Sequence, residues 1–392
     1  MKKFITVLMC IVILVNSSVW CSAFAEKEPF VGYTKFTNYW ISTQYDSNAN
    51  VRDVIPIENV DGDITGYSIS FSSLGKPMGY VVLDLSDNTD VNPIVEYSLE
   101  GSDPYTSIAN RVVNNNLDIT NISEKMISLG AFSYAVQVHT KDDVKMISQQ
   151  GKTIDLSTYK IRYDKLEQSS EKQTTKSGEE YGKSTVNFWD AWLDTAPGVA
   201  KNQKTIYGTN TFVSLDMSKM PSYYGDGLTA GDHDEGNCGP TAVTTIMEYW
   251  RVCRAKSNLI ADRKIDLAYA RIAALLKYDP EAGTFNHNIK SAVEKYAEDQ
   301  GYEATVDNYW TDTWSDFTRD INNDITILTQ VGGKDDDGKQ IGHYCVAFGY
   351  RENKDGSRFL QVANGWDNSC NRFLKFKPSE LNQFNGFAIS IT

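Results

Sequence analysis

Cysteine is scarce in this chain, with six among 392 residues, and two of these, Cys10 and Cys21, fall within the first 25 residues. The rest of the sequence holds four: Cys238, Cys253, Cys345 and Cys370. Four scattered thiols are too few for a disulfide framework, but one disulfide between two of them is still compatible with the sequence. Cys253 and Cys345 lie in periodic apolar patterns, which favours ordinary core packing for both side chains.

Basic charge is in deficit as well, because 38 Lys and Arg face 51 Asp and Glu, a net charge of −13 at pH 7. No basic cluster interrupts this balance, so the sequence argues against nucleic acid or an anionic membrane as a partner. The acidic stretch KDDDGKQ at 334–340 lacks the ligand spacing of a calcium loop. We therefore expect no metal ion and no cofactor.

Apolar runs long enough to span a bilayer are missing after residue 25. The first 25 residues, MKKFITVLMCIVILVNSSVWCSAFA, place two lysines before an apolar run and end on Ala-Phe-Ala. That order is typical of a secretory signal peptide over residues 1–25, with a retained membrane anchor as the alternative. The expected mature protein starts near Glu26, is secreted or associated with the cell surface, and has no membrane contact after signal removal.

A chain of 392 residues exceeds what one hydrophobic core usually organises, which predicts two domains. Residues 26–165 contain short runs rich in Val, Ile, Tyr and Phe, such as GYSISFSS and GYVVLDLS, separated by turn-forming residues. This pattern predicts a smaller, strand-rich α+β domain with one helix near 107–119. Residues 166–182 are polar and lack core-forming periodicity, which is typical of a linker between domains.

The second predicted domain comprises residues 183–392. From Gly239 onward, apolar residues recur at steps of three and four: Val243, Ile246, Met247, Trp250 and Cys253. This spacing predicts a helix, and two more are expected at 262–277 and 287–299, before strands that follow residue 324. Helices followed by an antiparallel sheet predict an α+β fold.

Cys238 directly precedes this first helix, in the stretch DEGNCGPTAV. The positive end of a helix dipole favours a thiolate, so we expect a lowered pKa unless the thiol is deeply buried. His343 begins the apolar strand GHYCVAFGY, and Asn364 and Trp366 end the next strand in NGW. A hairpin would place His343, Asn364 and Trp366 side by side. The pattern indicates Cys238 as a nucleophile and His343 as its general base. Asn364 would then orient the imidazole, and the Trp366 indole would cover it from water.

Cys before a long helix, then Gly-His, then Asn-Gly-Trp resembles the papain-like cysteine peptidases. NCGPTA followed by GHYCVAFGY most resembles the bacterial branch of bacteriocin-leader (double-glycine) peptidases and their secreted relatives, over about residues 205–392. The resemblance implies a papain-like C-terminal domain that acts on a peptide or protein substrate. It also implies Cys238 as nucleophile, His343 as general base and acid, and Asn364 as the residue that orients His343.

Two positions depart from that family pattern. The glutamine that supplies an oxyanion donor about six residues before the cysteine is replaced by Asp232, a poor donor. Three candidates remain for this role: Asn237, His233 and the backbone N–H of Cys238. Asp367 also competes with Asn364 as the orienting group, because the leader-peptidase branch commonly uses Asp there.

The first domain has a weaker resemblance of its own. GYVVLDLSDNTDVNPIVEYSLEG, at 79–101, is similar to the propeptide of the streptopain family over about forty residues. That similarity implies a precursor whose residues 26–165 inhibit or chaperone the second domain until the linker is cut. Two other functions stay open: a cell-wall amidase or acyltransferase on the same fold, and a non-catalytic adhesion or inhibitory module, which Asp232 favours.

Overall fold

The computed structural model describes most of the chain outside its N-terminus and central segment: residues 37–42, 48–85, 92–114, 119–130, 132–149, 151–156, 199–206, 214–224, 227–229, 236–279, 283–309, 313–334, 340–376 and 384–392. The predicted signal peptide, the predicted linker, Asp232 and His233 lie outside the described residues. No helix among the described residues is long and apolar enough to cross a membrane.

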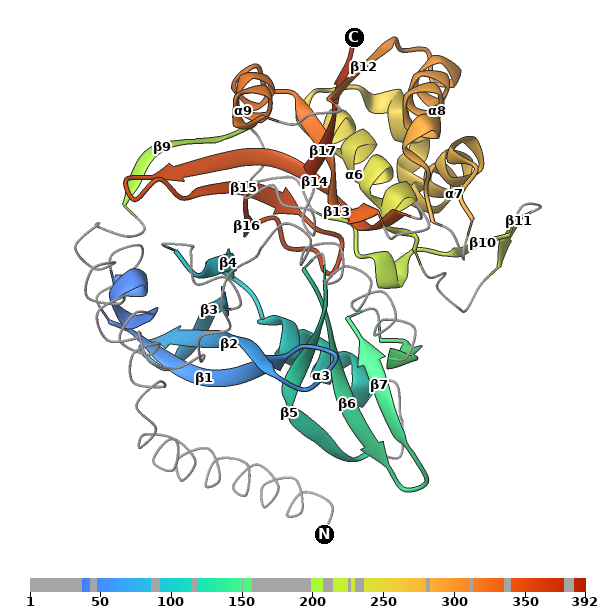
Figure 1. Cartoon of the computed structure of the whole chain (residues 1–392). Coiled ribbons are helices and arrows are strands. Elements are labelled where there is room, and N and C mark those ends of the chain that lie inside the picture. The colour runs from blue at the N-terminus through green and yellow to red at the C-terminus, as the bar shows by residue number, and fades with distance from the viewer. Residues whose placement is uncertain are drawn as a thin grey trace.

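The N-terminal unit, which is defined here as strands β1 to β8 with helix α3, is strand-rich (Figure 1). Its elements are β1 (Ala49–Glu58), β2 (Ile64–Ser73), β3 (Lys76–Asp84), β4 (Ile94–Ser98), α3 (Pro104–Asn114), β5 (Ile119–Gly130), β6 (Ser133–Thr140), β7 (Val144–Ser148) and β8 (Thr153–Ile154). The single helix predicted near 107–119 is α3. It packs against β5, β6 and β7 through one buried face that includes Ile108 and Val112.

The C-terminal unit, defined as β9 to β17 with the helices between them, combines helices and an antiparallel sheet. Its elements are β9 (Ala200–Thr205), η2 (Met217–Lys219), β10 (Ser222–Tyr224), β11 (Gly227–Thr229), α6 (Cys238–Cys253), η3 (Ser257–Arg263), α7 (Ile265–Leu276), α8 (Asn286–Asp299), β12 (Ala304–Tyr309), α9 (Trp314–Asn322), β13 (Thr326–Lys334), β14 (Gln340–Asn353), β15 (Arg358–Ala363), β16 (Arg372–Lys375) and β17 (Phe384–Ile391). Both units are therefore α+β, as the sequence predicted.

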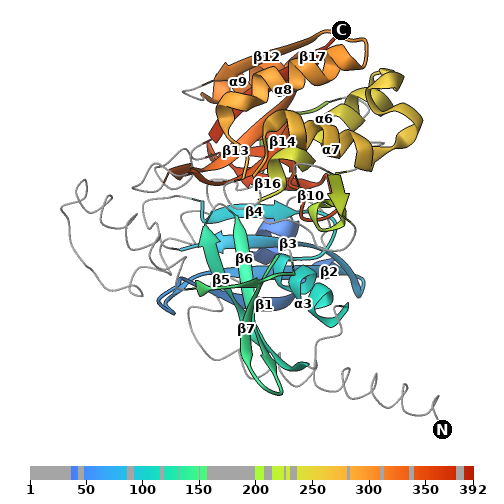
Figure 2. The same ribbon diagram turned by 90° about the vertical axis from the view of Figure 1, so that its right-hand side faces the viewer.

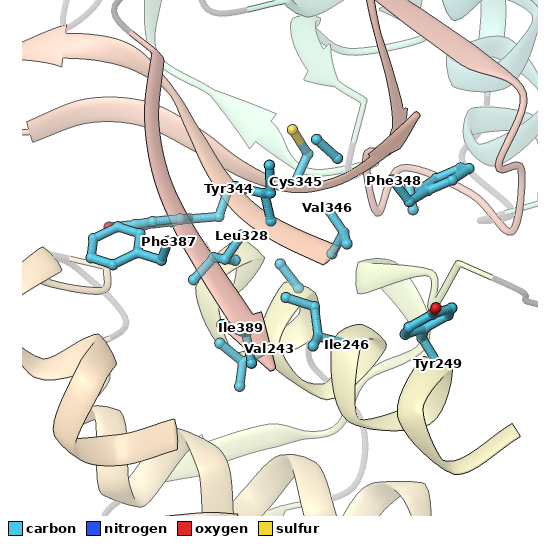
Figure 3. Packing of buried hydrophobic residues seen from close by; sticks show 14 of the residues in the cluster. Val243, Ile246, Tyr249, Leu328, Tyr344, Cys345, Val346, Phe348, Phe387 and Ile389 are labelled. Atoms are coloured by element: carbon cyan, nitrogen blue, oxygen red, sulfur yellow. The ribbon is translucent and has the colours of Figure 1, made fainter. Parts of the chain in front are cut away.

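Helix α6 is the centre of the C-terminal core. Val243 and Ile246 are fully buried and, in Figure 3, face Ile389 and Val346 of the sheet. Burying such a side chain contributes about 1.5–3 kcal/mol, so this face fixes α6 firmly against strand β14. The packing brings the first turn of α6, with Cys238, next to the strand that carries His343.

One sheet runs through both units. The described strands follow the order β12-β17-β13-β14-β15-β16-β4-β3-β2-β1-β5-β6-β7-β8, and β9 pairs with β14. All pairs in it are antiparallel except β1 with β5. Figure 2 shows β4 of the N-terminal unit directly beneath β16 of the C-terminal unit. The prediction of two domains did not anticipate this shared sheet.

Candidate active site

Cys238 is the first residue of α6 and is only 8% exposed. Its Sγ donates to the carbonyl oxygen of Gly236 at 3.8 Å. Burial raises the pKa of the thiol above its ordinary value, although the N–H groups of Tyr344, Gly239 and Cys238 act to lower it. A lowered pKa was expected only for a thiol that is not deeply buried, and here the exception applies, because desolvation outweighs the helix N-terminus.

His343 lies on β14, is 5% exposed, and stacks on the indole of Trp366 with ring centroids 4.5 Å apart and planes 9° apart. Its Nε2 lies 2.5 Å from the backbone carbonyl oxygen of Asn364. A carbonyl only accepts, so Nε2 carries the proton and Nδ1 holds the lone pair in the neutral ring. Burial lowers the pKa of His343 to about 4, despite the opposing effect of this carbonyl.

Cys238 and His343 are thus both uncharged near neutral pH. The first is a protonated thiol and the second a neutral imidazole whose Nδ1 is a base. Among the hydrogen bonds of the described residues, none joins these two side chains. Catalytic hydrogen bonds are often long or misaligned before substrate binds, so this arrangement fits a resting site.

Asn364 contacts His343 through its main chain and not through its side chain. The Oδ1 atom of Asn364 accepts instead from the N–H of Trp366 at 3.2 Å, which closes the turn after β15. Gly365 in this turn has φ +76°, a conformation that favours glycine. Asn364 therefore lies beside His343, but the group that contacts the ring is its backbone carbonyl.

Asp367, the other candidate for the group that orients His343, is paired with Arg372 and with the N–H of Ser369. Its Oδ2 lies 2.6 Å from Nη2 of Arg372, and its Oδ1 accepts from the N–H of Ser369 at 2.8 Å. Burial raises the pKa of this carboxyl, but Arg372 and the Ser369 N–H outweigh burial and leave the pKa lowered. Asp367 therefore stays ionised and paired with Arg372.

Asp232, which stands at the family's donor position, and the candidate donor His233 both lie outside the described residues. Asn237 is buried, and its Nδ2 donates to the carbonyl oxygen of Met217 at 3.1 Å. The N–H groups of Cys238 and Gly239 point at the thiol and lower its pKa. The backbone of the first turn is therefore the oxyanion donor best supported by the described geometry.

Sequence reasoning missed the segment at Asp216–Met217, which links the two halves of the site. The N–H of Met217 donates to the carbonyl of Gly365 at 2.8 Å, while its own carbonyl accepts from Asn237. Arg111 of α3 donates to the carbonyl of Trp366 and forms an ion pair with Asp216 at 3.3 Å. These contacts join residues far apart in the sequence, so no local sequence motif predicts them.

Residues 227–384 match the model of the Peptidase_C39 like family. The C-terminal unit is similar to that family. The match contains Cys238, His343 and Asn364, and it confirms the resemblance to papain-like cysteine peptidases that the motifs implied.

One solved structure, that of active wild-type interpain A cysteine protease from Prevotella intermedia, is 11% identical, with a TM-score of 0.32, over 49% of this chain and 96% of that chain. No curated protein matches the chain. Among the described residues, no group of three His, Cys, Asp or Glu side chains is arranged to hold a metal ion.

Proposed function

We propose that the protein is a secreted cysteine peptidase that hydrolyses peptide bonds with Cys238, His343 and Asn364. The observation that carries the proposal is the environment of His343. The ring is held by the Asn364 carbonyl at Nε2, covered by Trp366, and placed on a strand that packs against the helix beginning at Cys238. The match to the Peptidase_C39 like family supports the same chemistry.

In this proposal, Nδ1 of His343 accepts the thiol proton as Sγ of Cys238 attacks the substrate carbonyl carbon. The negative charge that develops on the substrate oxygen is stabilised by backbone N–H groups of the first turn of α6. The imidazolium then donates its Nδ1 proton to the leaving amine, and water later hydrolyses the thioester. Throughout, the carbonyl of Asn364 accepts from Nε2 and stabilises the imidazolium.

The proposal includes export and synthesis as a precursor. The signal-like first 25 residues support secretion, and a cell-surface location is compatible with them. The contacts of Arg111 with the Trp366 carbonyl and with Asp216 support a precursor in which the N-terminal unit restrains or chaperones the C-terminal unit. The partners of the site are then a peptide or protein substrate and, within the chain, the N-terminal unit.

A non-catalytic adhesion or inhibitory module is the second candidate. Two observations favour it: burial raises the pKa of Cys238, and no described hydrogen bond joins its thiol to His343. An amidase or acyltransferase would use the same groups on another substrate.

Labelling with a peptide-based epoxide, followed by peptide mapping, tests the proposal. We expect the C-terminal unit, once separated from the N-terminal unit, to be modified at Cys238 much faster than at Cys253 or Cys370, the internal control thiols. His343→Ala should abolish that selectivity, and slower labelling of the intact chain would support the precursor. Cys238 reacting no faster than the control thiols in every form would favour the non-catalytic module. Hydrolysis of peptides, and not of cell-wall amides, separates peptidase from amidase.

A further inference from the structure

Strands β4 and β16 meet where the two units join. They pair antiparallel, with Arg372 opposite Ser98, Phe373 opposite Tyr97 and Leu374 opposite Glu96. We call this strand pair, with the side chains that bridge it, the seam (Figure 2). Its main-chain bonds make the N-terminal unit a continuation of the sheet that carries His343.

A charged cluster is buried at the seam. Nη1 of Arg372 lies 3.1 Å from the Glu96 carboxylate, and the two side chains are 2% and 1% exposed. The hydroxyl of Tyr80 accepts from Arg372 and donates to Glu96. Separating the units leaves Nη2 of Arg372 with Asp367, but takes Nη1 away from both Glu96 and Tyr80.

Further contacts extend the seam on both sides of this cluster. Lys375 donates to the backbone carbonyl of Asn92, and the Asn92 amide donates to Asp355 at 3.1 Å and to Ser357 at 3.2 Å. On the other side, the Tyr97 ring stacks on Phe373 with centroids 4.7 Å apart. Polar and apolar contacts between the two units therefore continue on both sides of the buried cluster, in which Glu96 Oε2 and Arg372 Nε have no hydrogen-bond partner among the described residues.

Two contributions favour the joined state: Tyr97 packs on Phe373, and each strand edge satisfies the N–H and C=O groups of the other. The buried ion pair mainly determines which side chain is accepted opposite Arg372, because the charges regain their hydration when the units separate. We propose that the edge of β16 is a lasting docking site for β4, so that the N-terminal unit stays bound as a noncovalent subunit after the linker is cut. Glu96 is the residue that the buried Arg372 selects in its partner strand.

Retention changes what activation of the proposed precursor requires. The bound N-terminal unit keeps Arg111 on the carbonyl of Trp366 and on Asp216, beside the stacked His343. A cut in the linker alone therefore leaves these contacts in place, and freeing the site needs a second event that opens the seam. This consequence rests on the proposed precursor, whereas retention itself does not.

The test uses the full chain with a protease recognition sequence inserted between residues 166 and 182. After complete cutting, the two fragments are run on a size-exclusion column at micromolar concentration and then diluted to measure the Kd. We expect the fragments of the parent protein to co-elute. Separate elution of folded fragments at micromolar concentration would overturn the proposal.

Glu96→Gln removes the charge that pairs with Arg372 and should raise the Kd about a hundredfold or more. The matched control is Glu100→Gln, because Oε2 of Glu100 accepts from Nδ2 of Asn371 at 2.6 Å at the exposed rim of the same seam. The Kd of this control should stay within a fewfold of the parent value. Tyr97→Ala acts through packing instead of charge and should also weaken the complex. Circular dichroism of the uncut variants shows that each folds. Equal Kd values for Glu96→Gln, Glu100→Gln and the parent would show that the buried cluster does not hold the units together.

Labelling of Cys238 in the cut proteins then separates this inference from the proposed function. We expect slow labelling in the co-eluting parent complex and faster labelling in cut Glu96→Gln once its fragments have dissociated. Fast labelling in the still-associated parent would refute the need for a second event. If no form hydrolyses a peptide, the peptidase proposal fails, while co-elution still decides retention.

Discussion

Gly239 follows the proposed nucleophile in the first turn of α6, and the sign of its replacement by alanine tests the packing there. In an open helical position, Gly→Ala stabilises a protein by roughly 0.5–1 kcal/mol, because glycine loses more backbone entropy on folding. Here a Cβ would lie 2.3 Å from Oγ1 and 2.6 Å from Cβ of Thr284. Overpacking of this kind costs about 1–3 kcal/mol. We therefore expect Gly239→Ala to lower the free energy of unfolding by about 1–2 kcal/mol.

Urea unfolding of the full chain, followed by tryptophan fluorescence, measures this change. The Thr284 hydroxyl has no hydrogen-bond partner among the described residues, so Thr284→Ala removes the nearest atom without breaking a bond. In that background Gly239→Ala should cost less, by about 0.5–1 kcal/mol, because part of the clash is gone. A stabilising Gly239→Ala, or the same cost in both backgrounds, would refute the reasoning.

Three further predictions concern the proposed catalytic residues. Asn364→Ala keeps the backbone carbonyl on His343 and loses only the hydrogen bond from the Trp366 N–H, which is worth about 1 kcal/mol. The rate of peptide hydrolysis should therefore fall by less than about tenfold. His343→Ala should abolish hydrolysis. The pKa of His343 in the folded protein, about 4, lies below its ordinary value, so the unfolded chain binds more protons at this residue. The free energy of unfolding should therefore fall by about 3 kcal/mol as the pH drops from 6.5 to 4. The difference between urea titrations of the parent and His343→Gln isolates this effect, since Asp320, whose pKa burial raises to about 6, acts in the opposite direction. In the intact chain, alkylation of Cys238 by iodoacetamide should reach half its maximal rate at a higher pH than a small free thiol does, and a midpoint below that of the free thiol would contradict the burial argument.

Periodicity predicted the elements whose burial follows a simple repeat. The apolar steps after Gly239 gave a helix that the structure places at Cys238–Cys253, and the helix expected at 287–299 is Asn286–Asp299. Helix α9 was missed although its signal was readable. Thr313 and Asp316 form a capping box, in which each side chain accepts from the other residue's N–H.

The sequence alone could not decide the direction of the Cys238 pKa shift, because it shows a helix N-terminus directly but shows burial only indirectly. The helix dipole lowers a thiol pKa within one turn, while desolvation depends on every segment that covers the sulfur. Those segments come from parts of the chain that no local pattern connects. Glu96 illustrates the reverse case, because a carboxylate inside the apolar strand IVEYS is itself a sign of a buried partner.

Asn364, in the NGW motif, shows how much a short sequence motif can predict about the site. NGW identified the turn that meets His343, but the atom that does so is a backbone oxygen. Its position depends on the turn at Gly365, where a Cβ would lie 3.1 Å from Cγ of Met217, and on Met217 itself. The orientation of the histidine is therefore encoded by a glycine and a packed methionine more than by the amide of Asn364. A replacement of Gly365 or Met217 should disturb His343 more than a replacement of Asn364, although neither Gly365 nor Met217 belongs to the proposed triad.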